Sequence, residues 1–468
     1  MSDEEDRVPP HGVDVPRGGG PGRDVVPFGE AVRAWFAISL QTFGGPAGQI
    51  AVMQHVLVDK KRWIGQRRFL HALSFCTLLP GPEAQQLAIY VGWLLNGTRG
   101  GLVAGSLFVL PGLVALMGLS AVYVAWGESS VVTALFAGLA PAVLAIVAHA
   151  VVRVGKRAFG HPALLTLGVA AFIALSMFHV PFPIVIAAAA AIGLGLGRWA
   201  PETMRAPGHD ETTDSRPPLI ADDALHNEHP SWGHAAKVLG IGLVAWGVPI
   251  AAVAILTGTH SIFTQQGMFF SGTAVVTFGG AYAVLAYVAQ RAVEVYGWLT
   301  PGEMVRGLAL AETTPGPLIM VVQFVAFLGA YRHPGSLNPW AAAVLGALLT
   351  TWVTFVPCFV FIFLGAPSVE KLRGNHAISA ALIGVTAAVV GVIGNLAVYF
   401  AIHTLFGKVS TNTWGPLTVQ LPEFGSLHPA AVLIAIVAAV LLFRRGWSVL
   451  RTLGVCAALG LATVLLPA

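Results

Sequence analysis

Charged residues are scarce in this chain. Asp, Glu, Lys and Arg make up 10% of its 468 residues, and hydrophobic residues make up 56%, whereas about 25% of a soluble globular domain is charged. The stretches 101–125, 131–152, 235–256, 339–364 and 378–402 contain at most one charged residue each and are long enough to cross a bilayer as a helix. The composition excludes a soluble domain and predicts an all-α polytopic membrane protein within a lipid bilayer.

Motifs for enzyme chemistry are absent as well. The cysteines Cys76, Cys358 and Cys456 lie in apolar stretches without metal-ligand spacing. The sequence has no G-x-x-x-x-G-K-[ST] nucleotide loop, no H-E-x-x-H zinc motif and no Ser/Lys or Asp/Asp pair on one helix face. We therefore predict no enzyme activity, no cofactor and no metal. The net charge of +4 is small and gives no indication of a nucleic-acid partner.

The chain does contain an internal repeat. Thr-Phe-Gly-Gly at 42–45 and Pro-Gly-Pro at 80–82 recur at 277–280 and 315–317, in both cases 235 residues later. The ungapped alignment that joins them contains 11 identities in 41 positions, including Trp63 with Trp298. Such self-similarity indicates two homologous halves. Gly and Pro breaks at matching places in two apolar halves are the best sequence indication of a transporter binding site.

The apolar arms beside these breaks are short, roughly 11 to 16 residues each, which is too few to cross a bilayer and suits a re-entrant hairpin. Broken backbone at membrane depth occurs only where protein or a water-filled cavity surrounds it. The hairpin tips are therefore expected to line a site.

Basic clusters predict the orientation. Five Lys or Arg residues lie within 60–68, and others lie within 153–157, 198–216, 371–373 and 444–451; the positive-inside rule places all of them in the cytoplasm. The first two hairpins then enter from the cytoplasmic face and the second two from the outer face. We predict an inverted-topology repeat with re-entrant, broken helices, comprising about nine full spans and four hairpins; the alternative is roughly thirteen conventional spans.

The predicted topology divides the chain into five segments. They are a disordered cytoplasmic tail over 1–27, a first transport repeat over 28–197, a cytoplasmic linker over 198–234, an inverting transmembrane helix over 235–257 and a second transport repeat over 258–468. The linker histidines His209, His226, His229 and His234 lack regular ligand spacing, so a solvated linker is preferred to a metal site.

Helix electrostatics predict what the tips bind. Gly45 is placed as an N-cap with Pro46 at the first helical position, and Gly-Pro pairs at 81–82 and 316–317 repeat the pattern. Each new helix would direct free N–H groups and its positive end toward the middle of the membrane, where they favour oxyanions. The predicted substrate-binding residues are Thr42, Gly44, Gly45, Gln49, Gly81, Glu83, Gln85, Gln86, Thr277, Gly279, Gly280, Thr313, Thr314 and Gly316.

Three ionisable residues are predicted to handle charge or protons. Glu83 and Glu312 flank the two Pro-Gly-Pro breaks, where a protonated carboxyl group could donate to an oxyanion and so couple proton and anion binding. The alternative for Glu83 is a helix-capping carboxylate. Arg33 could pair with substrate or with Glu83, and its alternative is a snorkelling interfacial arginine.

Several motifs in order resemble the chromate ion transporter family in its long form with two homologous halves. They are Phe-Gly-Gly-Pro at 43–46, Pro-Gly-Pro-Glu-Ala at 80–84, Gln-Leu-Ala-Ile-Tyr at 86–90, Glu-Thr-Thr-Pro-Gly-Pro at 312–317 and the segment 324–327. One departure is Ala281, which stands where the first half has Pro46. The resemblance implies chromate efflux and chromate resistance, with sulfate as a competing analogue.

The resulting prediction is a multi-pass plasma-membrane transporter with a cytoplasmic N-terminus. It exports chromate or a sulfate-like dianion, driven by an ion or voltage gradient, with protons as a candidate coupling ion and a homodimer as a candidate assembly. An anion channel, or an importer of sulfate-like oxyanions, would use the same broken helices.

Overall fold

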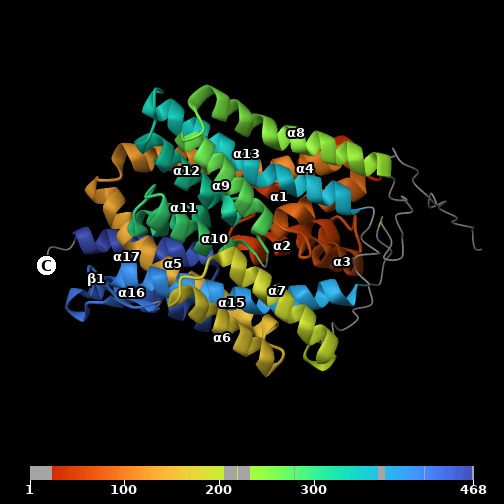
Figure 1. Ribbon diagram of the computed structural model, residues 1–468. Helices are drawn as coiled ribbons and strands as arrows, with labels where there is room; N and C mark the ends of the chain where they lie inside the picture. The colour runs from red at the N-terminus through yellow and green to blue at the C-terminus, as the bar shows by residue number, and fades with distance from the viewer. Residues whose placement is uncertain are drawn as a thin grey trace, which may run out of the picture.

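The computed structural model describes residues 24–204, 219, 232–278, 280–366, 375–415 and 417–465, and these residues form a helical bundle with one small sheet (Figure 1). Several predicted features lie outside the described residues. They are the tail over 1–23, most of the linker with His209, His226 and His229, the basic cluster 371–373, and the tip residue Gly279.

Seven helices precede the linker: α1 Phe28–Ser39, α2 Gly45–Gln54, α3 Gln66–Cys76, α4 Glu83–Trp126, α5 Ser130–Ala158, α6 Pro162–Ser176 and α7 Phe182–Trp199. After it come α8 Trp232–Thr257, α9 Ile262–Val276, α10 Ala281–Gln290, α11 Pro301–Thr313, α12 Val321–Arg332, α13 Pro339–Gly365, α15 His376–Leu405, α16 Pro429–Ala439 and α17 Val449–Leu465. Short π or 3-10 turns are η1 His55–Lys60, η2 Pro201–Met204, η3 Arg291–Val295, η4 Leu318–Met320, η6 Phe424–Ser426 and η7 Val440–Arg444.

Many of these helices suit a membrane. Within the described ranges, α4, α5, α7, α8, α13 and α15 are long and apolar enough to cross a bilayer, and shorter apolar helices cover 162–176, 318–332, 429–444 and 449–463. The prediction of an all-α polytopic membrane protein is confirmed. The number of full spans stays a prediction.

The arrangement places the short arms in the interior. In Figure 1, α4, α8 and α13 lie along the top, and α6, α7 and α15 lie along the bottom. Between these two layers, α2 and α3 lie right of centre and α10 and α11 left of it. The short helices of both predicted repeats therefore lie in the interior of the bundle.

Helix α4 is interrupted near its first third. Asn96 (φ −141°, ψ 30°) and Gly97 (φ 60°, ψ −156°) leave helical geometry, and the Asn96 side chain donates to the carbonyl of Val26 at 2.6 Å. The kink separates a short arm, 83–95, from a long apolar helix that ends at Trp126. The short arm has the length expected for the second limb of a hairpin.

The helix starts at the tips differ by one residue from the prediction. Gly44, not Gly45, is the N-cap of α2, and Pro46 takes the second helical position. Gly44 and Gly45 have φ values of 78° and 74°, a left-handed region that glycine enters without a steric penalty. At the other breaks Pro82 and Pro317 are themselves the N-cap residues.

A β-hairpin between α15 and α16 was not predicted. Strands β1 Val409–Trp414 and β2 Leu417–Pro422 pair antiparallel, with Val409 opposite Pro422. The alternating β-branched residues Val409, Thr411 and Thr413 are typical of a strand. Because apolar segments surround these residues, the sequence prediction assigns them to the helical second repeat over 258–468.

The two halves interlock through glycine contacts. A Cβ on Gly138 of α5 would lie 1.9 Å from the carbonyl oxygen of Cys456 in α17, and a Cβ on Gly384 of α15 would lie 2.5 Å from that of Ala189 in α7. Backbones this close require glycine. Helix α5 thus packs against α17, the last helix of the second half, and α15 packs against α7, the last long helix of the first half.

Candidate substrate site at the crossed hairpin tips

The four broken tips meet one another in pairs that cross between the halves. The N–H of Gly316 donates to the carbonyl oxygen of Thr42 at 3.0 Å, and the N–H of Gly81 donates to that of Thr277 at 2.8 Å. Gly316 and Gly81 have φ values of 99° and 126°. Positive φ turns each peptide toward the opposite half, which explains why glycine occupies both positions.

These two bonds are counterparts of each other. Adding 235 to Thr42 and Gly81 gives Thr277 and Gly316, so exchanging the halves turns one bond into the other. The alignment of the repeat and the contacts in space therefore agree at the tips. Two π-helical turns, η1 and η3, also follow α2 and α10 at matching places.

The helices that start at the tips begin without a side-chain cap. No side chain accepts from the first N–H groups of α2, α4, α10 or the η4–α12 segment. Side chains cap α5, α6, α9, α11, α13 and α15, whereas α1, α3, α7 and α16 also start without a side-chain cap. The N-terminal N–H groups at the tips are thus left to a ligand or to water, in the geometry that favours anions.

A buried acid and a tyrosine lie beside the first tip. The hydroxyl group of Tyr282 donates to Oε1 of Glu312 at 2.6 Å, and a Cβ on Gly45 would lie 3.5 Å from the same hydroxyl oxygen. Glu312 is 1% exposed, and its Oε2 has no hydrogen-bond partner among the described residues. Gln49 donates to the carbonyl oxygen of Gly316 at 2.6 Å and joins the same cluster.

Most of the predicted side-chain donors already have acceptors. Each tip threonine donates its hydroxyl to a carbonyl one turn back in its own helix, at 2.6–3.1 Å; these threonines are Thr42, Thr277, Thr313 and Thr314. Gln86 donates to the carbonyl of Pro80 at 2.7 Å. Gln85 differs, because it is fully buried and neither amide atom has a partner within the described part. Among the side-chain donors that the sequence predicts for the site, Gln85 therefore has an amide that is available to a ligand.

Two arginines of α5 lie at longer range from the two acids, and both are exposed. Within the described residues no hydrogen bond or ion pair joins them to the acids; a long-range electrostatic effect links Arg157 to Glu83, and Arg153 to Glu312 and Tyr282. They lie four residues apart and therefore on one helix face. In the sequence both are markers of orientation, and their spacing on one helix face also indicates a shared direction. Nothing in the sequence around Tyr282 pointed to its role.

Arg33 lies apart from this cluster. Its Nε donates to the carbonyl of Gly29 at 3.2 Å, and its side chain is exposed near the start of α1. Gly280 has a φ of 102° and precedes α10. The roles of Arg33 and Gly280 stay predictions.

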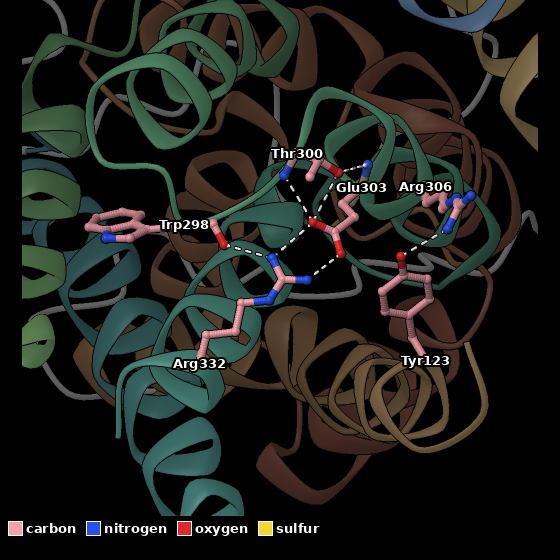
Figure 2. Close-up of polar contacts among 6 residues, drawn as sticks. All are labelled: Tyr123, Trp298, Thr300, Glu303, Arg306 and Arg332. Carbon is pink, nitrogen blue, oxygen red and sulfur yellow. Dashed lines mark hydrogen bonds and ion pairs between the residues drawn. The ribbon is translucent and has the colours of Figure 1, made fainter. Parts of the chain in front are cut away.

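A polar cluster fixes the base of the second hairpin pair (Figure 2). Glu303 and Thr300 form a capping box at the start of α11, and Arg332 at the end of α12 donates to Glu303 Oε2 at 2.9 Å and to the carbonyl of Trp298 at 3.1 Å. Arg306 donates to the hydroxyl of Tyr123 in α4 at 3.1 Å. These bonds hold α11 and α12 together and attach α11 to α4.

Comparison with known proteins identifies a family that matches this chain. The profile of the chromate transporter family matches residues 29–194 and 264–461. The chromate transport protein of Pseudomonas aeruginosa is 31% identical over 365 residues, which are 76% of each chain. That of Cupriavidus metallidurans is 28% identical over 362 residues, which are 77% of this chain and 79% of the relative.

A shorter relative matches only part of the chain. The uncharacterized transporter YwrB of Bacillus subtilis is 29% identical over 163 residues, which are 34% of this chain and 83% of that protein. No solved structure matches the chain.

Proposed function

This chain belongs to the chromate transporter family, and from that premise we propose that it exports chromate from the cytoplasm through the crossed hairpin tips. The relatives from Pseudomonas aeruginosa and Cupriavidus metallidurans carry the name chromate transport protein. Membership makes this chain a membrane transporter with a chromate transport role. The direction, the driving force and the residues involved are our proposal.

The crossed pair of tip hydrogen bonds carries the proposal. It brings four uncapped helix starts to one place, where two come from each half. A tetrahedral dianion matches such a site, because its oxygens accept hydrogen bonds in several directions. The Gln85 amide would add a neutral donor, and Arg153 and Arg157, which are exposed on α5, would add positive potential at longer range.

The same contacts support an inverted repeat. Hairpins that entered from one face would bring their bases together as well as their tips. Here the tips of one half bond to those of the other, while α2 and α10 lie on opposite sides of the centre in Figure 1. Alternating access would then arise from rocking of one half against the other around the fixed tips.

Membrane voltage favours export. Moving two negative charges through about 100 mV yields about 4.6 kcal/mol, which corresponds to roughly a thousandfold concentration ratio. An inside-negative potential therefore drives a dianion outward without a nucleotide-driven motor.

Inverted membrane vesicles test the function. We expect them to take up chromate when a potassium–valinomycin gradient makes the lumen positive, because the lumen corresponds to the cell exterior. Uptake should saturate with chromate and be reduced by excess sulfate. Vesicles without the protein provide the control. Uptake that is independent of voltage in both directions, or equal with and without the protein, would contradict export by this chain.

The orientation has a separate test at Asp59, the second-last residue of η1, and Ser130, which starts α5. Both residues are exposed. In a cysteine-free background, we expect Asp59→Cys to be shielded from a membrane-impermeant thiol reagent in intact cells and to react in inverted vesicles. Ser130→Cys should show the opposite pattern. Labelling of position 59 in intact cells would place the first hairpins on the outer face and overturn the proposed topology.

A further inference from the structure

A cavity of about 250 Å³ lies between α6, α10, α15 and β2. Its lining includes Ala286, Ala289, Gln290 and Glu294 from α10 and η3, together with Asn395 and Tyr399 from α15. We infer that this cavity is the outer exit vestibule of the anion path, and that Glu294 in its wall makes re-entry of an external dianion unfavourable. The inference rests on the proposed function and orientation.

The cavity is joined to the central site by one face of α10. This helix starts at a tip, and its second residue, Tyr282, contacts the buried acid Glu312. Ala286, Ala289 and Gln290 follow at spacings of four, seven and eight residues, which place them on the face of Tyr282. The distance from Tyr282 to Gln290 along the helix is about 12 Å. Ala286 and Ala289 on this face also line the cavity, and they pack against the core of the bundle.

The repeat shows how the two sides of the path differ in charge. Gly138 and Gly384 occupy matching places on α5 and α15, since each contacts the last long helix of the other half. Their offset is 246 residues, which is 11 more than the 235 between the tips, and it aligns Arg153 with Tyr399. The positive charge that acts on the central acids from α5 thus has a neutral phenol as its counterpart in the vestibule.

The cavity itself favours departure of an anion. Among the described residues that line it, Glu294 is the one carboxylate and His179 the one basic side chain, and no Lys or Arg is present. Tyr399 also has a buried hydroxyl without a partner in the described ranges. Such polar groups can solvate a passing oxyanion, while the carboxylate repels it electrostatically. A dianion released into this cavity is therefore held weakly.

Transport kinetics measured separately at the two faces test the inference. We expect Glu294→Gln to lower the half-saturating external chromate concentration about threefold to tenfold in chromate exchange, the size expected for one unit charge acting on a dianion in a partly hydrated space. Glu294→Arg should lower it further. The half-saturating concentration at the cytoplasmic face should not change. Glu128→Gln, which removes an exposed acid from the α4–α5 connection, is the matched control.

Access to the cavity has its own measurement. In the cysteine-free background, Ala286→Cys should react with an impermeant thiol reagent from outside, whereas Ala283→Cys, which is fully buried on another part of α10, should not. Unchanged external half-saturation in both Glu294 variants, or labelling of position 286 from the cytoplasmic side alone, would overturn the inference. If no variant or wild type moved chromate, the proposed function would fail, and labelling at position 286 would still decide whether the cavity opens outward.

Discussion

Valine in place of Gly316 or Gly81 is expected to reduce chromate uptake by inverted vesicles to background. Both glycines have positive φ, where a β-branched residue costs roughly 1–3 kcal/mol. A Cβ at position 81 would also lie 2.9 Å from Cys358 Sγ and from Gln86 Nε2, and one at position 316 would lie 3.3 Å from Gly112 Cα. The tip would have to move, which breaks the crossed hydrogen bonds and misplaces the helix starts.

A control variant separates the strain of a positive φ from the loss of the contacts at the tips. Gly335 also has a positive φ, 62°, but a Cβ there would meet no atom within 4 Å, and the residue lies in the loop between α12 and α13. We expect Gly335→Val to keep most of the transport activity. Quantitative immunoblots of the membrane fraction would show that all three variants are inserted. Normal uptake by both tip variants would remove the tips from the substrate site.

Replacing Glu312 by Gln is expected to remove the effect of a pH gradient on chromate uptake. In the proposed coupling, a protonated Glu312 donates to the anion, so proton and anion travel together and a more acidic cytoplasmic-side medium stimulates uptake. A glutamine retains a neutral donor but cannot exchange a proton. We expect stimulation by the pH gradient to fall about tenfold or more, while voltage-driven uptake and the half-saturating concentration change little.

Two further variants identify which acid is responsible. Tyr282→Phe removes the hydroxyl group that donates to Glu312 at 2.6 Å, and it should weaken the pH response without abolishing it. Glu83→Gln serves as the comparison, because Glu83 starts α4 and has the capping role as its alternative. If the pH response survives in Glu312→Gln and disappears in Glu83→Gln, the coupling group is Glu83. If it survives in both variants, voltage is the main driving force.

The sequence predicted where the chain breaks far better than what the broken ends contact. Gly and Pro act on their own backbone, so TFGG and PGP located the tips within one residue. The acceptors of the side chains depend on local helix geometry. Thr42 and Thr277 each bond a carbonyl one turn back, which a hydroxyl does readily in an apolar helix, and they are thereby taken from the set of free donors.

Partners from distant segments could not be predicted in this way. Tyr282 and Glu312 are thirty residues apart, and their hydrogen bond follows from the crossing of two hairpins. Arg153 and Arg157 lie on α5, far in sequence from either acid. The positive-inside rule uses them only to predict orientation. Tertiary contact, not local pattern, gives Tyr282 and Glu312 their place in the candidate site.

The reciprocal bonds at the tips also bear on biogenesis. Thr42 bonds to the N–H of Gly316, and Gly81 bonds to the carbonyl of Thr277. Because these partners lie in the second repeat, they are synthesised long after the tips of the first. Until then its tips carry unpaired main-chain groups, which are costly inside a bilayer. The tip contacts can therefore form only after the second half has been synthesised, and until then the tips of the first half need other hydrogen-bond partners such as water.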